Sequence, residues 1–164
     1  MPTIILLIVL CIVFFLIYLK FYNEERAIIN SKVEIYETTC GKYQKGEVDI
    51  NSKKILVDIA DNVCKRDLGL SGRTSLNTDS GMIFSFDKEG NYGFWMKDMN
   101  FSLDIIWINS NFIISGIEKD LATSTYPKSF GNKYKAVYVL EVPAGYSDKN
   151  NIKVGEKIIF TKNN

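Results

Sequence analysis

The stretch Gly93–Ile108, GFWMKDMNFSLDIIWI, decides how the rest of the chain is interpreted. It combines large apolar side chains with three charged residues, Lys97, Asp98 and Asp104. Charged side chains are seldom fully buried unless they are paired, so these charges lie either in water at strand ends or in a polar site. The second half, Leu103–Ile108, is apolar on both faces apart from Asp104, which predicts a strand in the middle of a sandwich or barrel.

The residues that follow predict a hairpin. Turn residues at Asn109–Asn111 separate Leu103–Ile108 from a second predicted strand at Phe112–Ile117. Because side chains alternate along a strand, Asp104 shares a face with Ile106, at the mouth of a buried strand. A carboxylate there is either neutral because of desolvation or kept ionised by a cation.

Short apolar segments separated by turn residues continue on both sides of this hairpin. A short helix is predicted from Asp61 or Asn62, which can cap it, to about Leu70. A long polar loop is predicted over Glu118–Tyr134. The other predicted strands are Glu47–Ile50, Lys53–Ile59, Gly81–Phe86, Gly93–Lys97, Ala136–Val142 and Lys157–Phe160. The fold class is therefore mainly β, a single compact β-sandwich or barrel-like domain with one short helix.

An unbroken apolar run from Ile4 to Leu19 opens the chain. With the aromatic residues that follow it, its length approaches the roughly 20 residues of a membrane span. We predict an N-terminal transmembrane helix, or an uncleaved signal, over residues 1–22, a tether over residues 23–46 and the β domain over residues 47–164. The start of this tether could continue the helix of the anchor. A cleaved signal peptide fits less well, because the run lacks a basic start and an A-x-A-like site.

The composition excludes several classes of function. The 164 residues carry a net charge of +1, which favours neither nucleic acid nor an anionic surface as a partner. There is no histidine, which excludes triads, dyads and metal sites that need one within this chain. Cys11, Cys40 and Cys64 match no zinc or CxxC pattern, although Cys40 and Cys64 could pair in an oxidising compartment. We predict no cofactor, no metal ion and no nucleic-acid partner.

Several residues are candidates for binding or catalysis. A Lys97–Asp104 pair would line a pocket with aromatic and thioether side chains beside it. The alternative is structural, because a buried pair, or a carboxylate that caps backbone N–H groups at a bulge, would stabilise the fold. The candidate binding residues are Trp95, Met96, Lys97, Asp104, Arg66 and Glu141, and the catalytic candidates are Asp104 and Lys97.

Two further interpretations concern residues outside the central stretch. Arg66 and Arg73 flank the short helix and either face solvent or point at a carboxylate, that of Asp104 or of a ligand. Glu141 faces outward if its two apolar neighbours face inward, and it could form a glycosidase-like carboxylate pair with Asp104. A divalent cation held by Asp58, Asp61 or Asp104 is equally weakly indicated, since no DxDxDG-like loop is present.

Several motifs occur in the order and spacing of a known family. They are Gly69-Leu70, Gly81-Met82-Ile83-Phe84, Trp95-Met96-Lys97, Leu103-Asp104 and Leu140-Glu141 with Gly145. On these motifs the chain resembles, over about Glu47–Phe160, the family catalogued as domain of unknown function 192. It departs at Ser71, Asp98, Met99 and Ser102, where the family usually has Met, Asn, Thr and Pro. The resemblance implies a compact, mostly β sandwich with a short helix, often behind a signal or anchor segment, and no established activity.

The resemblance also favours a domain outside the cytoplasm, although Lys20 and Arg26 after the apolar run favour the opposite orientation. We therefore predict a single-pass protein of the cell membrane with an extracytoplasmic β domain. This domain would be a binding or accessory module for a small ligand or an envelope component. The alternative is a carboxylate-dependent hydrolase that uses Asp104 with Lys97, and the sequence leaves open whether the protein is an enzyme.

Overall fold

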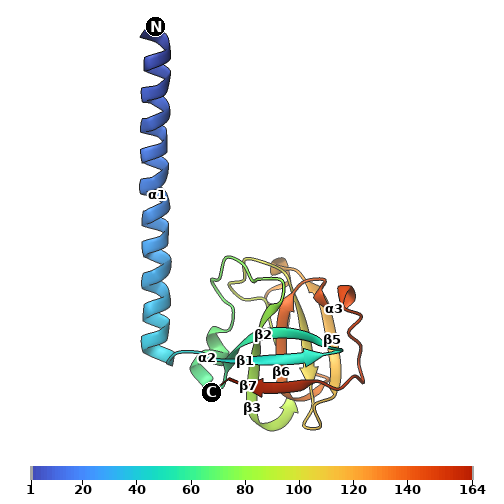
Figure 1. The fold of residues 1–164 in the computed structure, drawn as a ribbon. Coiled ribbons are helices and arrows are strands. Elements are labelled where there is room, and N and C mark those ends of the chain that lie inside the picture. The colour runs from blue at the N-terminus through green and yellow to red at the C-terminus, as the bar shows by residue number, and fades with distance from the viewer. Residues whose placement is uncertain (1, 164) are drawn as a thin grey trace. The chain divides into compact units, whose positions relative to one another are not determined.

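The computed structural model describes the backbone of residues 2–163 and the side chains of residues 10–28 and 38–163. The chain forms two units, Met1–Lys42 and Tyr43–Asn164 (Figure 1). The first unit consists of one helix, α1 (Pro2–Cys40). The second contains the sheet and the short helices.

Helix α1 covers the predicted anchor and most of the predicted tether. It continues to Cys40 because no glycine or proline interrupts the chain between Thr3 and Cys40, and Gly41, with φ of 77°, follows its end. The tether predicted over residues 23–46 is thus mostly helical. Among residues with described side chains, no helix has both the length and the apolar character that crossing a membrane requires. Residues 1–9 of the predicted anchor lie outside that set.

Seven strands form one sheet in the second unit. In sheet order they are β5 (Ile114–Leu121), β4 (Leu103–Ile108), β6 (Lys135–Pro143), β3 (Ser80–Asn91), β2 (Lys53–Ala60), β1 (Gln44–Ile50) and β7 (Ile159–Lys162). Neighbouring strands are antiparallel except for β2 and β3, which are parallel. The mainly β prediction is confirmed.

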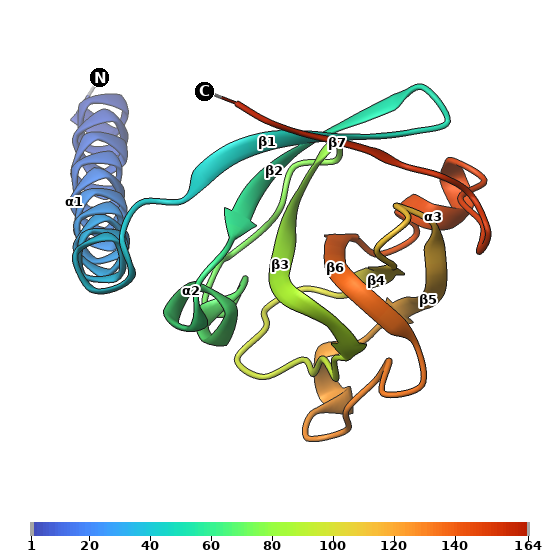
Figure 2. The ribbon, with the colours of Figure 1, turned by 90° about the horizontal axis from the view of Figure 1, so that it is seen from below.

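Backbone hydrogen bonds also join the two ends of this sheet. The N–H groups of Ile114 and Gly155 donate to the carbonyls of Glu156 and Ile114, both at 2.9 Å, and Ile158 N donates to Phe112 O at 2.8 Å. The first residue of β5 and the residues just before it thus pair with the segment before β7. Figure 2 shows the C-terminal segment running from the side of β5 towards β1. One curled sheet, rather than two stacked ones, corresponds to the barrel-like form of the prediction.

Each face of the sheet carries its own hydrophobic core. The inner core consists of Val48, Ile50, Ile55, Val57, Ile59, Ile83, Ile106, Ile108, Ile114, Leu140, Val142, Tyr146, Ile152 and Ile158. The outer core consists of Ala60, Leu70, Met82, Phe84, Met96, Leu103, Ile105, Trp107, Leu121, Phe130, Ala136 and Val139. Strand β4 is buried along its whole length and contributes to both, with Ile106 in the inner core and Trp107 in the outer core. Loops cover the outer core and add Leu70, Met96 and Phe130 to it. The predicted central position of this strand is confirmed, and so is the hairpin that it forms with β5.

The short helix is also confirmed, as α2 (Val63–Leu68). The side chain of Asn62 caps it by accepting from Lys65 N at 2.9 Å, and Gly69 is the C-cap. The structure adds η1 (Thr123–Thr125) and α3 (Tyr146–Lys149).

The strand predicted over Gly93–Lys97 is wrong. This segment has only an isolated bridge between Phe94 and Phe130. The ring of Phe94 packs edge-on against Phe84 and Trp107, at centroid distances of 4.8 and 6.0 Å. The segment therefore covers the outer face of the sheet instead of extending it.

Candidate ligand-binding site

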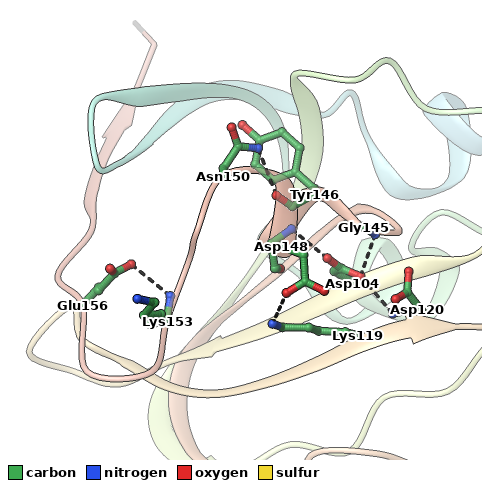
Figure 3. A network of polar contacts seen from close by, with 10 residues as sticks. Asp104, Lys119, Asp120, Gly145, Tyr146, Asp148, Asn150, Lys153 and Glu156 are labelled. Carbon is green, nitrogen blue, oxygen red and sulfur yellow. Dashed lines mark hydrogen bonds and ion pairs between the residues drawn. The ribbon is translucent and has the colours of Figure 1, made fainter.

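Asp104 lies fully buried near the start of β4, where backbone amides surround its carboxylate (Figure 3). Its Oδ1 accepts from the N–H groups of Asp120 at 2.9 Å and Gly145 at 3.1 Å. Its Oδ2 accepts from Ser147 N, in the first turn of α3, at 2.8 Å. These bonds join β4 to the end of β5 and to α3, which is the structural alternative considered for this residue.

The predicted Lys97–Asp104 pair is wrong. Lys97 is exposed on the loop that covers the outer core, and no ion pair in the part of the chain with described side chains includes it. The physical reason is that Asp104 shares a face with Ile106, in the inner core, and backbone amides already occupy both of its oxygens.

The other candidates in the loops and the short helix do not converge on one point. Met96 is buried in the outer core, whereas Trp95 is 56% exposed and lies edge-on to Tyr126, with centroids 6.1 Å apart. Arg66 donates from Nη1 to the carbonyl oxygen of Ser85 at 2.9 Å. Its guanidinium is therefore held by a backbone carbonyl, and neither of the two predicted positions, in solvent or against Asp104, describes it.

Glu141 on β6 faces away from the inner core, as predicted, because Leu140 and Val142 both belong to that core. It is nevertheless only 5% exposed, and no described residue forms a hydrogen bond with its Oε2. Burial raises the pKa of Glu141 from 4.5 to about 8, against the opposing effect of the positive charge of Arg73. This pKa favours the protonated acid over the carboxylate at pH 7.

The glycosidase-like pair of Glu141 and Asp104 is also wrong. In the register of β4 and β6, Asp104 lies opposite Val142, and Ile105 lies opposite Glu141. Because side chains alternate along each strand, the two carboxylates point to opposite faces of the sheet.

Arg73 brings Glu141 into a larger charged group, the Arg73 cluster, which consists of Lys45, Asp58, Arg73 and Glu141. Arg73 Nη2 bonds to Asp58 Oδ2 at 2.8 Å, and Lys45 Nζ pairs with Asp58 Oδ1. The strand registers place Met82 opposite both Asp58 and Glu141, so these two residues share one face with one strand between them. At about 4.8 Å between adjacent strands, their backbones lie about 10 Å apart.

The loop that carries Lys97, Asp98 and Asn100, here called the motif loop, supports the loop that carries Arg73. Three hydrogen bonds join them: Ser71 Oγ to Lys97 O at 3.0 Å, Gly72 N to Asp98 O at 2.9 Å, and Asn100 Nδ2 to Arg73 O at 2.9 Å. Asp98 has φ of 55°, a conformation that Asn and Asp adopt more readily than other residues with a Cβ. This accounts for Asp98 at the position where the resembled family has Asn.

A pocket of about 430 Å³ lies beside the cluster. Its lining includes Lys45, Asp58, Arg73, Ser75, Asn77 and Ser80. The sequence analysis missed both this pocket and the Asp58–Arg73 pair. Two features of the sequence pointed towards this pair. Asp58 is a charged residue in a strand of alternating pattern, and Arg73 lies beside the short helix, where an arginine that points at a carboxylate was one of the two interpretations.

Comparisons with other proteins bear on the family and the fold. A family model described as "Uncharacterized ACR" (DUF192) matches residues 46–160, and no curated protein matches the chain. A solved structure from Sinorhizobium meliloti 1021, described as a "putative transcription regulator", is 23% identical, with a TM-score of 0.66 over 73% of this chain and 95% of that chain. A protein of unknown function from Novosphingobium aromaticivorans DSM 12444 is 24% identical, with a TM-score of 0.62 over 70% and 83%. These two likenesses concern the fold alone, whereas the family model spans more than half of the sequence, and the chain therefore belongs to the DUF192 family.

Proposed function

We propose that the β domain binds a small ligand with an acidic group, in the pocket beside Arg73 and Lys45. The observation that carries this proposal is the charge balance of the Arg73 cluster. Two cationic side chains, Lys45 and Arg73, share one carboxylate, that of Asp58, in the lining of the pocket. Glu141, whose pKa burial raises to about 8, lies outside that lining, so the positive charges outnumber the negative ones. A pocket with an excess positive charge attracts acidic groups.

The accessibility and lining of the pocket support the same ligand class. The side chain of Lys45 is 68% exposed and that of Arg73 is 33% exposed, so both can reach a ligand. An arginine has five N–H donors, which leaves Arg73 able to bond an acid as well as Asp58. Leu56 adds an exposed apolar wall, and the volume lies within the range of about 300–1,000 Å³ usual for small-molecule sites.

The hydrolase alternative is not carried forward. It needs Asp104 and Lys97 to act on one substrate. The carboxylate of Asp104 is buried on the inner face of the sheet and bound by backbone amides, whereas Lys97 is exposed on the loop that covers the outer face. A binding or accessory role requires neither group.

We also propose that α1 tethers the domain to the cell membrane, with the domain outside the cytoplasm. The apolar run Ile4–Leu19 supports the tether. Cys40 and Cys64 are disulfide-bonded and Cys11 is free, and disulfides persist in oxidising compartments. Membrane fractionation, with thiol alkylation before and after reduction, tests this. A chain that stays in the supernatant, or that exposes three reactive thiols without reduction, refutes it.

Calorimetric titration of the full chain with succinate and with inorganic phosphate at pH 7 tests the binding site. We expect one of these anions to bind, Arg73→Gln to abolish binding and Lys45→Gln to weaken it. Arg66→Gln and Lys54→Gln are matched controls, because Arg66 bonds to a backbone carbonyl and Lys54 pairs with Glu47 away from Asp58. Failure of both anions to bind, or an equal loss in the control variants, refutes the proposal.

A further inference from the structure

We propose that Glu141 is a proton-controlled competitor for Arg73, so that the pocket holds acidic ligands while Glu141 is protonated and releases them when it ionises. The inference rests on the proposed function and adds its regulation. It concerns a group that the ligand itself need not touch, because Glu141 is almost completely buried and is not part of the pocket lining.

The surroundings of Glu141 make Arg73 its available counter-ion. Its neighbours across the sheet are apolar, Met82 on β3 and Ile105 on β4. The loop above supplies Arg73, the one charged group with a resolved effect on the pKa of Glu141 among the described residues. Tyr43 lies under the same guanidinium, with its ring centroid 5.7 Å from Cζ of Arg73, and its buried hydroxyl has no hydrogen-bond partner in the part of the chain with described side chains.

The protonation state of Glu141 therefore decides how Arg73 is used. While Glu141 is neutral, the acidic partner of Arg73 among the described residues is Asp58, and the guanidinium keeps donors for a ligand. A buried carboxylate without a partner is costly, so ionisation draws the guanidinium towards Glu141 and adds a negative charge that repels an acidic ligand. By linkage, a bound acid must in turn favour the protonated form of Glu141.

The first test follows the affinity of the full chain for succinate from pH 6.5 to pH 9.5, where both carboxyl groups of succinate are ionised. We expect the affinity of the parent to fall by about tenfold as Glu141 ionises around pH 8, which corresponds to a coupling of about one pKa unit. Glu141→Gln should bind succinate with little pH dependence. Glu118→Gln, a change in a glutamate that bonds to Tyr134 instead, should retain the profile of the parent.

The second test reads the proton itself, through the ¹³C chemical shift of the Glu141 carboxyl group. It should titrate near pH 8 in the parent and at higher pH in Arg73→Gln, because the charge of Arg73 lowers the pKa of Glu141. In Arg73→Lys, which retains the positive charge, the Glu141 carboxyl should titrate closer to its pH in the parent. This second variant keeps the test valid if Arg73→Gln does not fold.

The outcomes separate the two proposals. Succinate binding that is equally strong at pH 7 and pH 9.5 overturns the control by Glu141 and leaves the proposed function standing. A carboxyl shift that titrates near pH 4.5, or that does not respond to Arg73→Gln, overturns the same inference. Failure of succinate and inorganic phosphate to bind at any pH overturns the proposed function, and the inference with it.

Discussion

Asp104 and Glu141 are two buried carboxylates on adjacent strands, and they differ in almost every other respect. Asp104 is fully buried and accepts three backbone hydrogen bonds on the inner side of the sheet. Glu141 lies on the outer side, beside an arginine, with one carboxylate oxygen unpartnered. The comparison teaches that the partners of a buried acid, rather than its burial, indicate its role.

The two environments also differ in where the partners come from. Those of Asp104 are backbone groups of β5, α3 and the turn between β6 and α3, which are fixed once the sheet has formed. The charged group nearest in effect to Glu141 is the side chain of Arg73, which already bonds to Asp58 and can exchange one carboxylate for the other. The first arrangement stabilises a connection, and the second leaves a group that can change its state.

The largest expected effect comes from Asp104→Asn. An amide places an N–H₂ group against at least one of the three backbone donors, so hydrogen bonds to a carboxylate are lost and a buried donor is left unpaired. We expect the free energy of unfolding to fall by about 4 kcal/mol, measured by urea denaturation at pH 7. Asp67→Asn, an exposed change in α2, should alter it by less than about 0.5 kcal/mol. An equally small loss for Asp104→Asn would remove the distinction between the two acids.

The next effect is the pH dependence of stability that Glu141 imposes. Its pKa is raised from 4.5 to about 8 in the folded state, so the native chain binds more protons than the unfolded chain between these values, and stability falls as pH rises through this window. Glu141→Gln removes this term. The stability of the variant relative to the parent should rise by about 3 kcal/mol between pH 5.5 and pH 8, measured by urea denaturation. A constant difference between the two would show that Glu141 is ionised when folded.

A smaller effect is expected where the motif loop holds Arg73. Asn100→Ala removes the bond from Asn100 Nδ2 to Arg73 O and should lower the free energy of unfolding by about 1 kcal/mol. The free energy of succinate binding should fall by more than the free energy of unfolding does, because the lost hydrogen bond fixes the position of Arg73. Thermal unfolding and calorimetry on the same samples separate these effects, and unchanged binding would show that the loop of Arg73 does not depend on this support.

The smallest effect is expected from Lys97→Ala. Lys97 is exposed, and its backbone carbonyl, rather than its ammonium group, bonds to Ser71. We expect less than about 0.5 kcal/mol of change in stability and no change in succinate binding. A loss comparable to that of Asp104→Asn would restore the pairing of Lys97 and Asp104 that the structure contradicts.

The central hairpin and the short helix could be predicted because their signals are local. The two-faced apolar pattern of Leu103–Ile108, the turn after it and the Asn62 cap all act within a few residues. The end of α1 at Cys40 has a local signal too, because no glycine or proline interrupts the chain between Thr3 and Cys40 and Gly41 follows, but the polar composition of the predicted tether does not show how far the helix extends into it.

The site could not be predicted in the same way, because its contacts are distant in sequence. The alternation of side chains along β4 places Asp104 on the inner face. Its partners Gly145 and Ser147, however, follow β6 in the sequence, 41 and 43 residues after Asp104. Likewise, Asp58 meets Arg73 only because β2 and β3 pair in parallel and the intervening chain crosses over the sheet. Periodicity gives the face of a side chain, and only the register gives its neighbours.

The pairing of β1 with β7 has a consequence for how this domain folds. The first and last strands of the sheet are neighbours, and the segment just before β7 also bonds to the chain before β5. The inner core therefore stays open along one side until the last strand of the domain has been made. Contacts between such distant parts of the sequence slow folding and expose apolar surface meanwhile. A chain truncated before Ile159 should accordingly be an aggregation-prone, protease-sensitive intermediate and not a smaller stable domain.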